Sequence, residues 1–120
     1  MKRPKWAAQK RYKIVQRSGE RPGLFYSGID PWFRITECGR SKGSILSYTS
    51  GEVTRSAQGL CRRKTHTCCR GIHAYRTRAS ALDSAQEPNV VLSVWAKSWI
   101  GDGPKQRTRR VWVGRYVHRT

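Results

Sequence analysis

Alternation of apolar and polar positions is clearest between residues 90 and 100. The even positions Val90, Leu92, Val94 and Ala96 are all apolar, whereas the odd positions are Val91, Ser93, Trp95, Lys97 and Trp99. Successive side chains of a β-strand point to opposite faces of the sheet, so this period predicts a strand with one apolar face. It is the strongest strand pattern in the chain.

A last strand is predicted over about residues 109–118. One face of this strand would carry Trp112 and Tyr116, and the other would carry Val111, Val113 and Val117. β-Branched and aromatic residues favour strands, and the Gly-Asp-Gly-Pro sequence at 101–104 breaks the chain before this run. The two long strands are therefore expected to pair as an antiparallel C-terminal β-hairpin over about 90–118.

One helix is predicted over about residues 78–86. Thr77 offers a side-chain oxygen that would cap its N-terminus, and Ala81, Leu82 and Ala85 are spaced to cover a core. Shorter strand patterns lie at 12–15, 23–27, 44–49 and 71–75, and residues 50–70 show no clear period. These elements predict an α+β fold, a single small domain that is mainly antiparallel sheet with one clear helix.

Charge separates a basic N-terminal arm, residues 1–11, from a domain at residues 12–120. The 120 residues include 25 Lys and Arg, of which 17 are Arg, against seven Asp and Glu, for a formal net charge of +18. This surplus predicts a polyanionic partner, because phosphates that take over these charges release counter-ions. Arg favours phosphate further, since a planar guanidinium donates two parallel hydrogen bonds and can stack on a base.

The expected nucleic-acid contacts lie in the arm and along the C-terminal strands. The basic candidates are Lys2, Arg3, Lys5, Lys10, Arg11, Lys97, Lys105, Arg107, Arg109, Arg110 and Arg115, and the aromatic candidates are Trp95, Trp99 and Trp112. Interleaved cations and rings are typical of surfaces that hold a single strand, because cations follow the backbone while bases stack on the rings. This mechanism requires the cations to gather on one surface.

Four cysteines, Cys38, Cys61, Cys68 and Cys69, allow two disulfides, free thiols or a metal site. The sequence has no membrane-length apolar run and no apolar signal core, which predicts an intracellular, cytoplasmic protein without membrane partners. A reducing compartment disfavours disulfides. Cys61, His66, Cys68 and Cys69 are candidate zinc ligands, but their spacing lacks the paired ligands of a structural zinc site, so no cofactor is expected.

Cys69 and His73 form a candidate nucleophile and base for an enzyme. No third group that would orient the base is identifiable. Seven scattered acids are also few for a metal-dependent nuclease, which needs several carboxylates to hold its ions. A binding protein is therefore the main expectation. An enzyme that uses these two residues is the last of three hypotheses for the function.

Two segments carry a resemblance to a known domain. They are Tyr48-Thr-Ser-Gly51-Glu52-Val53 and Cys69-Arg-Gly71-Ile72-His73, the second followed by an alanine-bearing helix. The pattern resembles a small domain found in proteins of bacteriophages and large DNA viruses. The resemblance implies a phage or prophage origin, a place in the host cytoplasm, a compact α+β unit, and a shared structural or binding role for Gly71, Ile72 and His73.

The main expectation is thus a strongly basic, non-enzymatic nucleic-acid-binding protein encoded by a phage or prophage. The alternative is a phage-encoded inhibitor whose basic surface binds a host protein that handles nucleic acid, for example a defence nuclease. Small size, basicity and the viral resemblance fit both. A pull-down from host lysate separates them, because a protein partner that survives nuclease digestion favours the inhibitor.

Overall fold

The computed structural model describes residues 2–17, 24–26, 33–36, 39–42, 46–57, 59–64 and 70–118. Its elements are β1 (Gln9–Arg17), β2 (Leu24–Tyr26), β3 (Phe33–Thr36), β4 (Gly39–Lys42), β5 (Ser47–Thr49), β6 (Val53–Arg55), β7 (Ile72–Tyr75), α1 (Arg78–Ser84), β8 (Val90–Ala96), β9 (Lys105–Thr108) and β10 (Arg110–Val117). The predicted α+β class, mainly antiparallel sheet with one helix, is confirmed for these residues.

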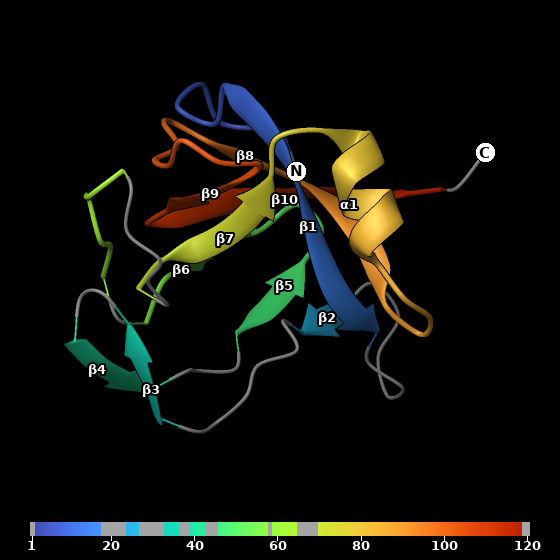
Figure 1. Cartoon of the computed structure of the whole chain (residues 1–120). Coiled ribbons are helices and arrows are strands. Elements are labelled where there is room, and N and C mark those ends of the chain that lie inside the picture. The colour runs from blue at the N-terminus through green and yellow to red at the C-terminus, as the bar shows by residue number, and fades with distance from the viewer. Residues whose placement is uncertain are drawn as a thin grey trace.

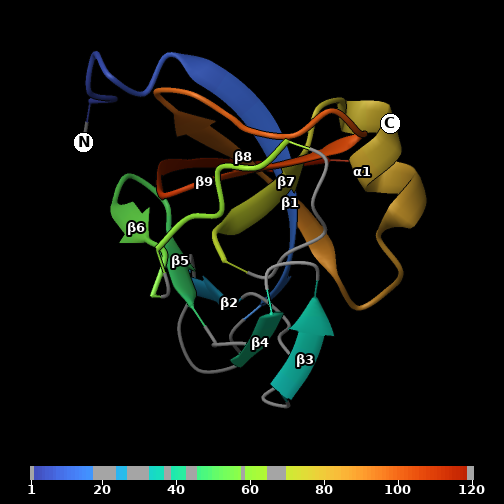
Figure 2. The same ribbon diagram turned by 60° about the vertical axis from the view of Figure 1, so that its left-hand side comes forward.

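The main sheet has eight strands and is strongly curved (Figures 1 and 2). Strands β5, β2, β1, β8, β10 and β6 follow one another across it, and each neighbouring pair is antiparallel. β7 branches from this path, because it pairs with β1 at Tyr12 and Tyr75 and with β9 along its whole length. β3 and β4 pair only with each other.

The end strands of this path, β5 and β6, lie close together because a tight turn joins them. Thr54 Oγ1 in β6 donates a hydrogen bond to Ser47 O in β5 at 2.8 Å. Gly51 in the turn has a φ of 84°, a left-handed conformation that glycine adopts without steric cost. Its N–H donates to Val113 O of β10 at 2.8 Å, so the turn after β5 is also hydrogen-bonded to β10.

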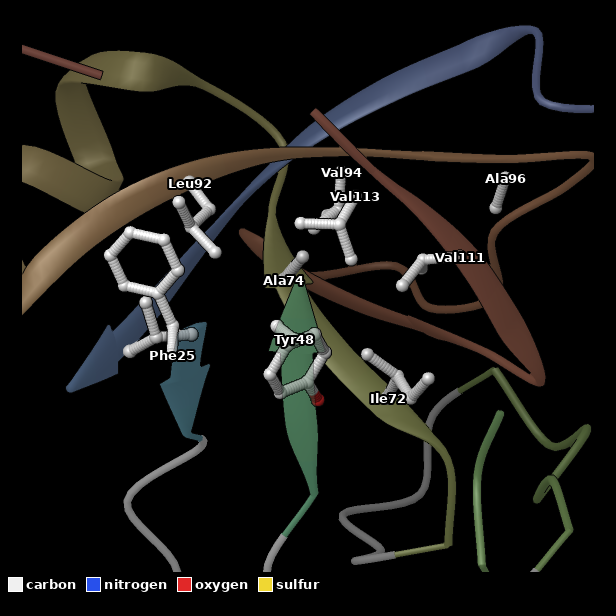
Figure 3. Packing of buried hydrophobic residues seen from close by; sticks show 10 residues of the cluster. Phe25, Tyr48, Ile72, Ala74, Leu92, Val94, Ala96, Val111 and Val113 are labelled. Carbon is white, nitrogen blue, oxygen red and sulfur yellow. The ribbon is translucent and has the colours of Figure 1, made fainter. Parts of the chain in front are cut away.

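The inner face of the curved sheet holds the main core (Figure 3). Its buried side chains are Val15, Phe25, Tyr48, Ile72, Ala74, Leu92, Val94, Ala96, Val111 and Val113. The predicted apolar face of residues 90–100 is confirmed, because Leu92, Val94 and Ala96 are fully buried in this cluster. The strand itself ends at Ala96, before the exposed Lys97.

The outer face of the sheet is covered at one end by α1 (Figure 1). The side chains packed there are Tyr12, Ile14, Tyr75, Ala81, Leu82, Ala85, Val91 and Val117. The predicted N-cap is confirmed, since the Thr77 side chain accepts a hydrogen bond from the Ser80 N–H at 3.2 Å. The helix ends at Ser84 instead of residue 86, because the backbone of Ala85 is extended at φ −78° and ψ 116°.

The long strands β8 and β10 pair antiparallel, as predicted, but a bulge interrupts their ladder. Val113 lies opposite Val94, and the next pair is Tyr116 with Leu92. Two residues of β10 therefore stand opposite the single residue Ser93, which is the definition of a β-bulge.

The bulge is stabilised by Ser93 and requires glycine at position 114. Ser93 Oγ accepts a hydrogen bond from the Arg115 N–H at 2.8 Å and donates one to Arg115 O at 3.3 Å. A Cβ added to Gly114 would stand 2.2 Å from Ser93 Oγ. The side-chain hydroxyl therefore occupies the space that any other residue at 114 would need.

The bulge overturns one sequence prediction about the faces of β10. Tyr116 packs against the main core on the side of Val111 and Val113, and Val117 joins the cluster under α1. The grouping of Tyr116 with Trp112 was wrong, because an extra residue shifts the alternation by one position beyond it.

The connection between β8 and β10 is also more than a hairpin loop. Residues 105–108 form β9, which pairs with β7 so that His73 lies opposite Arg107. An isolated bridge joins Ile100 to Arg107 as well. The last strand consequently begins at Arg110, and the predicted hairpin encloses a strand that belongs to another part of the sheet.

Candidate nucleic-acid interface

Four residues from four neighbouring strands form one row on the outer face of the sheet. Lys10 of β1 lies opposite Trp95 of β8, Trp95 opposite Trp112 of β10, and Trp112 opposite Val53 of β6. Directly opposed residues share a face, and this is the face that α1 covers at the other end of the strands. We call Lys10, Trp95, Trp112 and Val53 the tryptophan row.

The rings of the tryptophan row are only partly enclosed by the protein. Trp95 and Trp112 are half-buried and Lys10 is exposed. Val53 is 43% exposed, the highest value among the large apolar side chains of the described residues. The buried Nε1 of Trp112 has no hydrogen-bond partner among the described residues. The row therefore combines accessible apolar surface with a buried indole donor that no described residue satisfies.

Residues 2–8 fold back against this row, and we call them the N-terminal hook. The Ala7 N–H donates to Pro4 O at 3.1 Å, the Arg3 Nη1 donates to Ala7 O at 3.2 Å, and Ala7 is buried. The predicted arm extended to residue 11, whereas β1 begins at Gln9 and residues 9–11 belong to the sheet.

Cations lie directly against the rings of the hook and the row. The Arg3 guanidinium carbon is 3.6 Å from the centroid of the Trp95 ring, and Lys10 Nζ is 5.5 Å from the same ring. The Arg110 guanidinium carbon is 4.0 Å from the centroid of Trp6 in the hook. These distances are within the range of cation–π attraction, which is strongest for tryptophan.

β8 ends and β10 begins at the end of the sheet where β1 begins. A group of cations lies at this end. It comprises Arg3, Lys10, Arg11, Arg55, Lys97, Arg109 and Arg110. Arg17 and Arg78 lie elsewhere, against Tyr116 and the carbonyl of His118 respectively. The cations thus gather at one end without all belonging to one surface.

Arg11 and Arg76 form a second cationic group on the inner side of the same end. Arg11 Nε donates to Gln106 Oε1 at 2.8 Å, and its guanidinium carbon is 5.8 Å from the Trp99 ring centroid. Trp99 Nε1 donates to Gln9 O at 3.0 Å, so this candidate lies beside Arg11 and outside the tryptophan row. Burial and then the positive charge of Arg76 lower the pKa of Arg11.

A buried lysine that sequence reasoning missed lies two residues further along β1. Lys13 shares the inner face with Val15, and its Nζ donates to His73 O at 2.8 Å. Burial, and then the charge of Lys105, lower the pKa of Lys13 to about 8. The sequence carries no signal for this position, because the apolar residues beside Lys13 are Tyr12 and Ile14, which lie on the other face of the strand.

Arg107, a predicted contact, is instead part of the interior. It is 4% exposed, and its guanidinium donates to Cys61 O at 2.7 Å and to Arg63 O. These bonds hold the segment 59–64 against β9, so we remove Arg107 from the set of expected contacts. The basic candidates Lys2, Lys5, Lys97, Lys105, Arg109 and Arg115 are exposed.

The Gly71-Ile72-His73 motif has an evident part in the fold. Gly71 has a φ of 131°, and a Cβ there would lie 3.1 Å from Leu60 Cδ1. Ile72 is buried in the main core, and His73 supplies the carbonyl that binds Lys13. The implied binding role of the motif stays a prediction.

The candidate zinc ligands His66, Cys68 and Cys69 lie outside the described residues. Cys69 is also the candidate nucleophile of the enzyme hypothesis, so that prediction lies outside the described residues too. Cys61 is described and its thiol is buried. Among the described residues, no three His, Cys, Asp or Glu side chains come together as a potential metal site.

Within the described residues there is no helix whose length and apolar character would allow it to cross a membrane. Searches of protein-family models, of curated proteins and of solved structures return no match for this chain. The resemblance to a viral domain therefore stays a prediction from the two segments that carry it.

Proposed function

We propose that this protein binds single-stranded nucleic acid on the tryptophan row and the N-terminal hook, without catalysis. The observation that supports this most is the position of Trp95 and Trp112 opposite each other on two adjacent strands. Two cations, Arg3 and Lys10, lie against the ring of Trp95. Such a surface offers bases a stacking partner and offers the backbone its counter-charge.

The contact between Arg3 and Trp95 supports a stacked position for a base in this proposal. A planar guanidinium 3.6 Å from the ring centroid occupies the place that a stacked nucleobase would take. A base entering there displaces Arg3, whose guanidinium then donates to a phosphate of the same strand. The exchange keeps one planar group on the ring and adds a charge-assisted hydrogen bond.

The proposal concerns a single strand because the row uses ring faces. In a duplex the bases stack on one another and their faces are closed to side chains, whereas unpaired bases stack on aromatic residues. Stacking contributes about 1–3 kcal/mol for each base, so removal of one ring corresponds to a loss of about fivefold to 150-fold in affinity.

The test is binding of a fluorescently labelled, mixed-sequence single strand of about 15 nucleotides, followed by anisotropy. We expect Trp95→Leu to weaken binding by about tenfold or more. Tyr116→Leu, which removes an aromatic ring that packs against the core away from the row, is the matched control and should bind as the wild type does.

Two further results decide the proposal. Affinity should fall by orders of magnitude between about 50 and 200 mM salt, because several phosphate contacts release counter-ions. A duplex of the same sequence should compete poorly. Affinity that stays flat with salt would refute the phosphate contacts. Equal binding by Trp95→Leu and the wild type would show that the tryptophan row is not the binding surface.

A further inference from the structure

One hydrogen-bonded network at the start of β1 connects two guanidinium groups, those of Arg11 and Arg76. Arg76 Nε donates to Gly103 O and its Nη2 donates to Gly101 O, both at 3.0 Å. Gln106 Nε2 donates to the same Gly101 O at 3.0 Å, and Gln106 Oε1 accepts from Arg11 Nε at 2.8 Å. The network therefore runs without a break from Arg76 to Arg11.

The network orients these two cations but does not neutralise them. Within the described residues, their hydrogen-bond acceptors are all uncharged oxygens, and the charge of Arg76 acts unfavourably on Arg11. Asp102 stands in the same turn and is exposed, yet in this part of the chain neither guanidinium forms an ion pair with a carboxylate. A pair of like charges held together in this way is favourable for binding an anion.

Each guanidinium also keeps a terminal nitrogen for a ligand. Arg11 uses Nε and Nη1, the latter to Lys10 O at 2.8 Å, and Arg76 uses Nε and Nη2. Among the residues that the structure describes, Arg11 Nη2 and Arg76 Nη1 donate to no protein acceptor. Arg76 is exposed and Arg11 half-buried, so an ion from solvent reaches both. Lys105 adds an exposed third cation on the neighbouring strand.

We infer that Arg11 and Arg76 form a binding site for one phosphate group, separate from the tryptophan row. The inference rests on the proposed function for the source of that group, which is a phosphodiester of the bound strand. Lys10 and Arg11 are consecutive and point to opposite faces of β1, so the phosphate site begins where the tryptophan row ends. A nucleic-acid strand that stacks on Trp95 would reach this site at the end of the sheet where β1 begins.

The first experiment uses inorganic phosphate alone and does not depend on nucleic acid. In the NMR spectrum of the full chain, the Nε–H resonance of Arg11 should shift saturably with phosphate at constant ionic strength. Arg76→Gln should abolish this saturation. Arg78→Gln, which removes an exposed arginine two positions away that contacts His118 O, is the matched control and should retain it. A shift that is linear with phosphate, or equal in both variants, overturns the inference.

The second experiment measures the salt dependence of oligonucleotide binding. Loss of one phosphate contact should reduce the slope of log K against log salt by about 1 in Arg76→Gln and leave it unchanged in Arg78→Gln. The quenching of tryptophan fluorescence on binding should persist in both. Arg76→Lys, which keeps the charge, should recover most of the slope and so guards against a merely structural effect of the substitution.

The outcomes distinguish the two proposals. If the strand binds through Trp95 but Arg76→Gln and Arg78→Gln have equal slopes, the phosphate site is wrong and the proposed function stands. If phosphate saturates the Arg11 resonance but no oligonucleotide binds, the phosphate site stands and the proposed function is wrong.

Discussion

The buried Lys13 allows a quantitative prediction about stability. Its ammonium group lies on the inner face of β1, donates to His73 O at 2.8 Å and is 5.6 Å from the centroid of the Tyr48 ring. Burial and the nearby charge of Lys105 lower its pKa from 10.5 to about 8. At neutral pH this side chain is therefore charged in the folded protein at a cost that the unfolded chain does not bear.

The magnitude follows from the two pKa values. A difference of about 2.5 between 10.5 and 8 corresponds to about 3 kcal/mol at pH 7. Between pH 8 and 10.5 the unfolded state binds the proton more tightly than the folded state, so the free energy of unfolding rises with pH in this window. The gain from pH 7 to pH 9.5 attributable to Lys13 is about 2 kcal/mol.

Lys13→Met keeps an unbranched side chain and removes the charge. At pH 7 it should raise the free energy of unfolding by about 2 kcal/mol, because relief of the charge cost of about 3 kcal/mol exceeds the lost hydrogen bond of about 1 kcal/mol. At pH 9.5 the advantage should be close to zero. Lys10→Met, at an exposed position on the other face of the same strand, is the matched control. Its effect on the free energy of unfolding should not change between pH 7 and pH 9.5.

Urea denaturation of the three proteins at pH 7, 8 and 9.5, at constant ionic strength, measures these quantities. Subtraction of the Lys13→Met values from those of the wild type removes the contribution of all other titrating groups. A difference that does not change with pH would refute the reasoning. So would a variant that is less stable than the wild type by more than about 2 kcal/mol at pH 7, since Lys13 would then be a net stabilising ion.

Two further substitutions test the bulge and the interior arginine. Gly114→Ala should destabilise the fold by about 1–3 kcal/mol in urea denaturation, because its Cβ would stand 2.2 Å from Ser93 Oγ, whereas Gly103→Ala, with open space around it, should not. Arg107→Met should lose about 1–3 kcal/mol and speed amide hydrogen exchange in residues 59–64, because the carbonyls of that segment lose their donor; unchanged exchange there would contradict this role.

Local patterns were sufficient for most elements of the fold. The alternation at residues 90–96 identified both the strand and its buried face, since Leu92, Val94 and Ala96 lie in the core. Thr77 identified the start of α1 because N-capping depends on neighbours in the sequence. The short strands β6 and β9 had no such pattern, because β6 contains one apolar residue and β9 contains none, so neither shows an alternation.

The sequence likewise predicted one part of the candidate site and missed another. Composition predicted a polyanionic partner, and the interleaving of cations and rings indicated Trp95 and Trp112, which the structure places in one row. It did not separate Trp99, which lies beside Arg11 on the inner side. The arginine that joins this second group, Arg76, was not among the candidates, because the carbonyls that orient it come from the distant turn at residues 101–104.

The sequence by itself determined the buried face of β8, the cap of the helix and the excess of positive charge, because each depends on residue type and on spacing along the chain. Only the tertiary structure decided that Lys13 and Arg107 point inward while Lys10 and Arg110 reach the rings. Pairing between distant strands sets the direction of each side chain, and one extra residue opposite Ser93 reverses it for Tyr116. The location of a charge is thus a property of the register, which no local pattern contains.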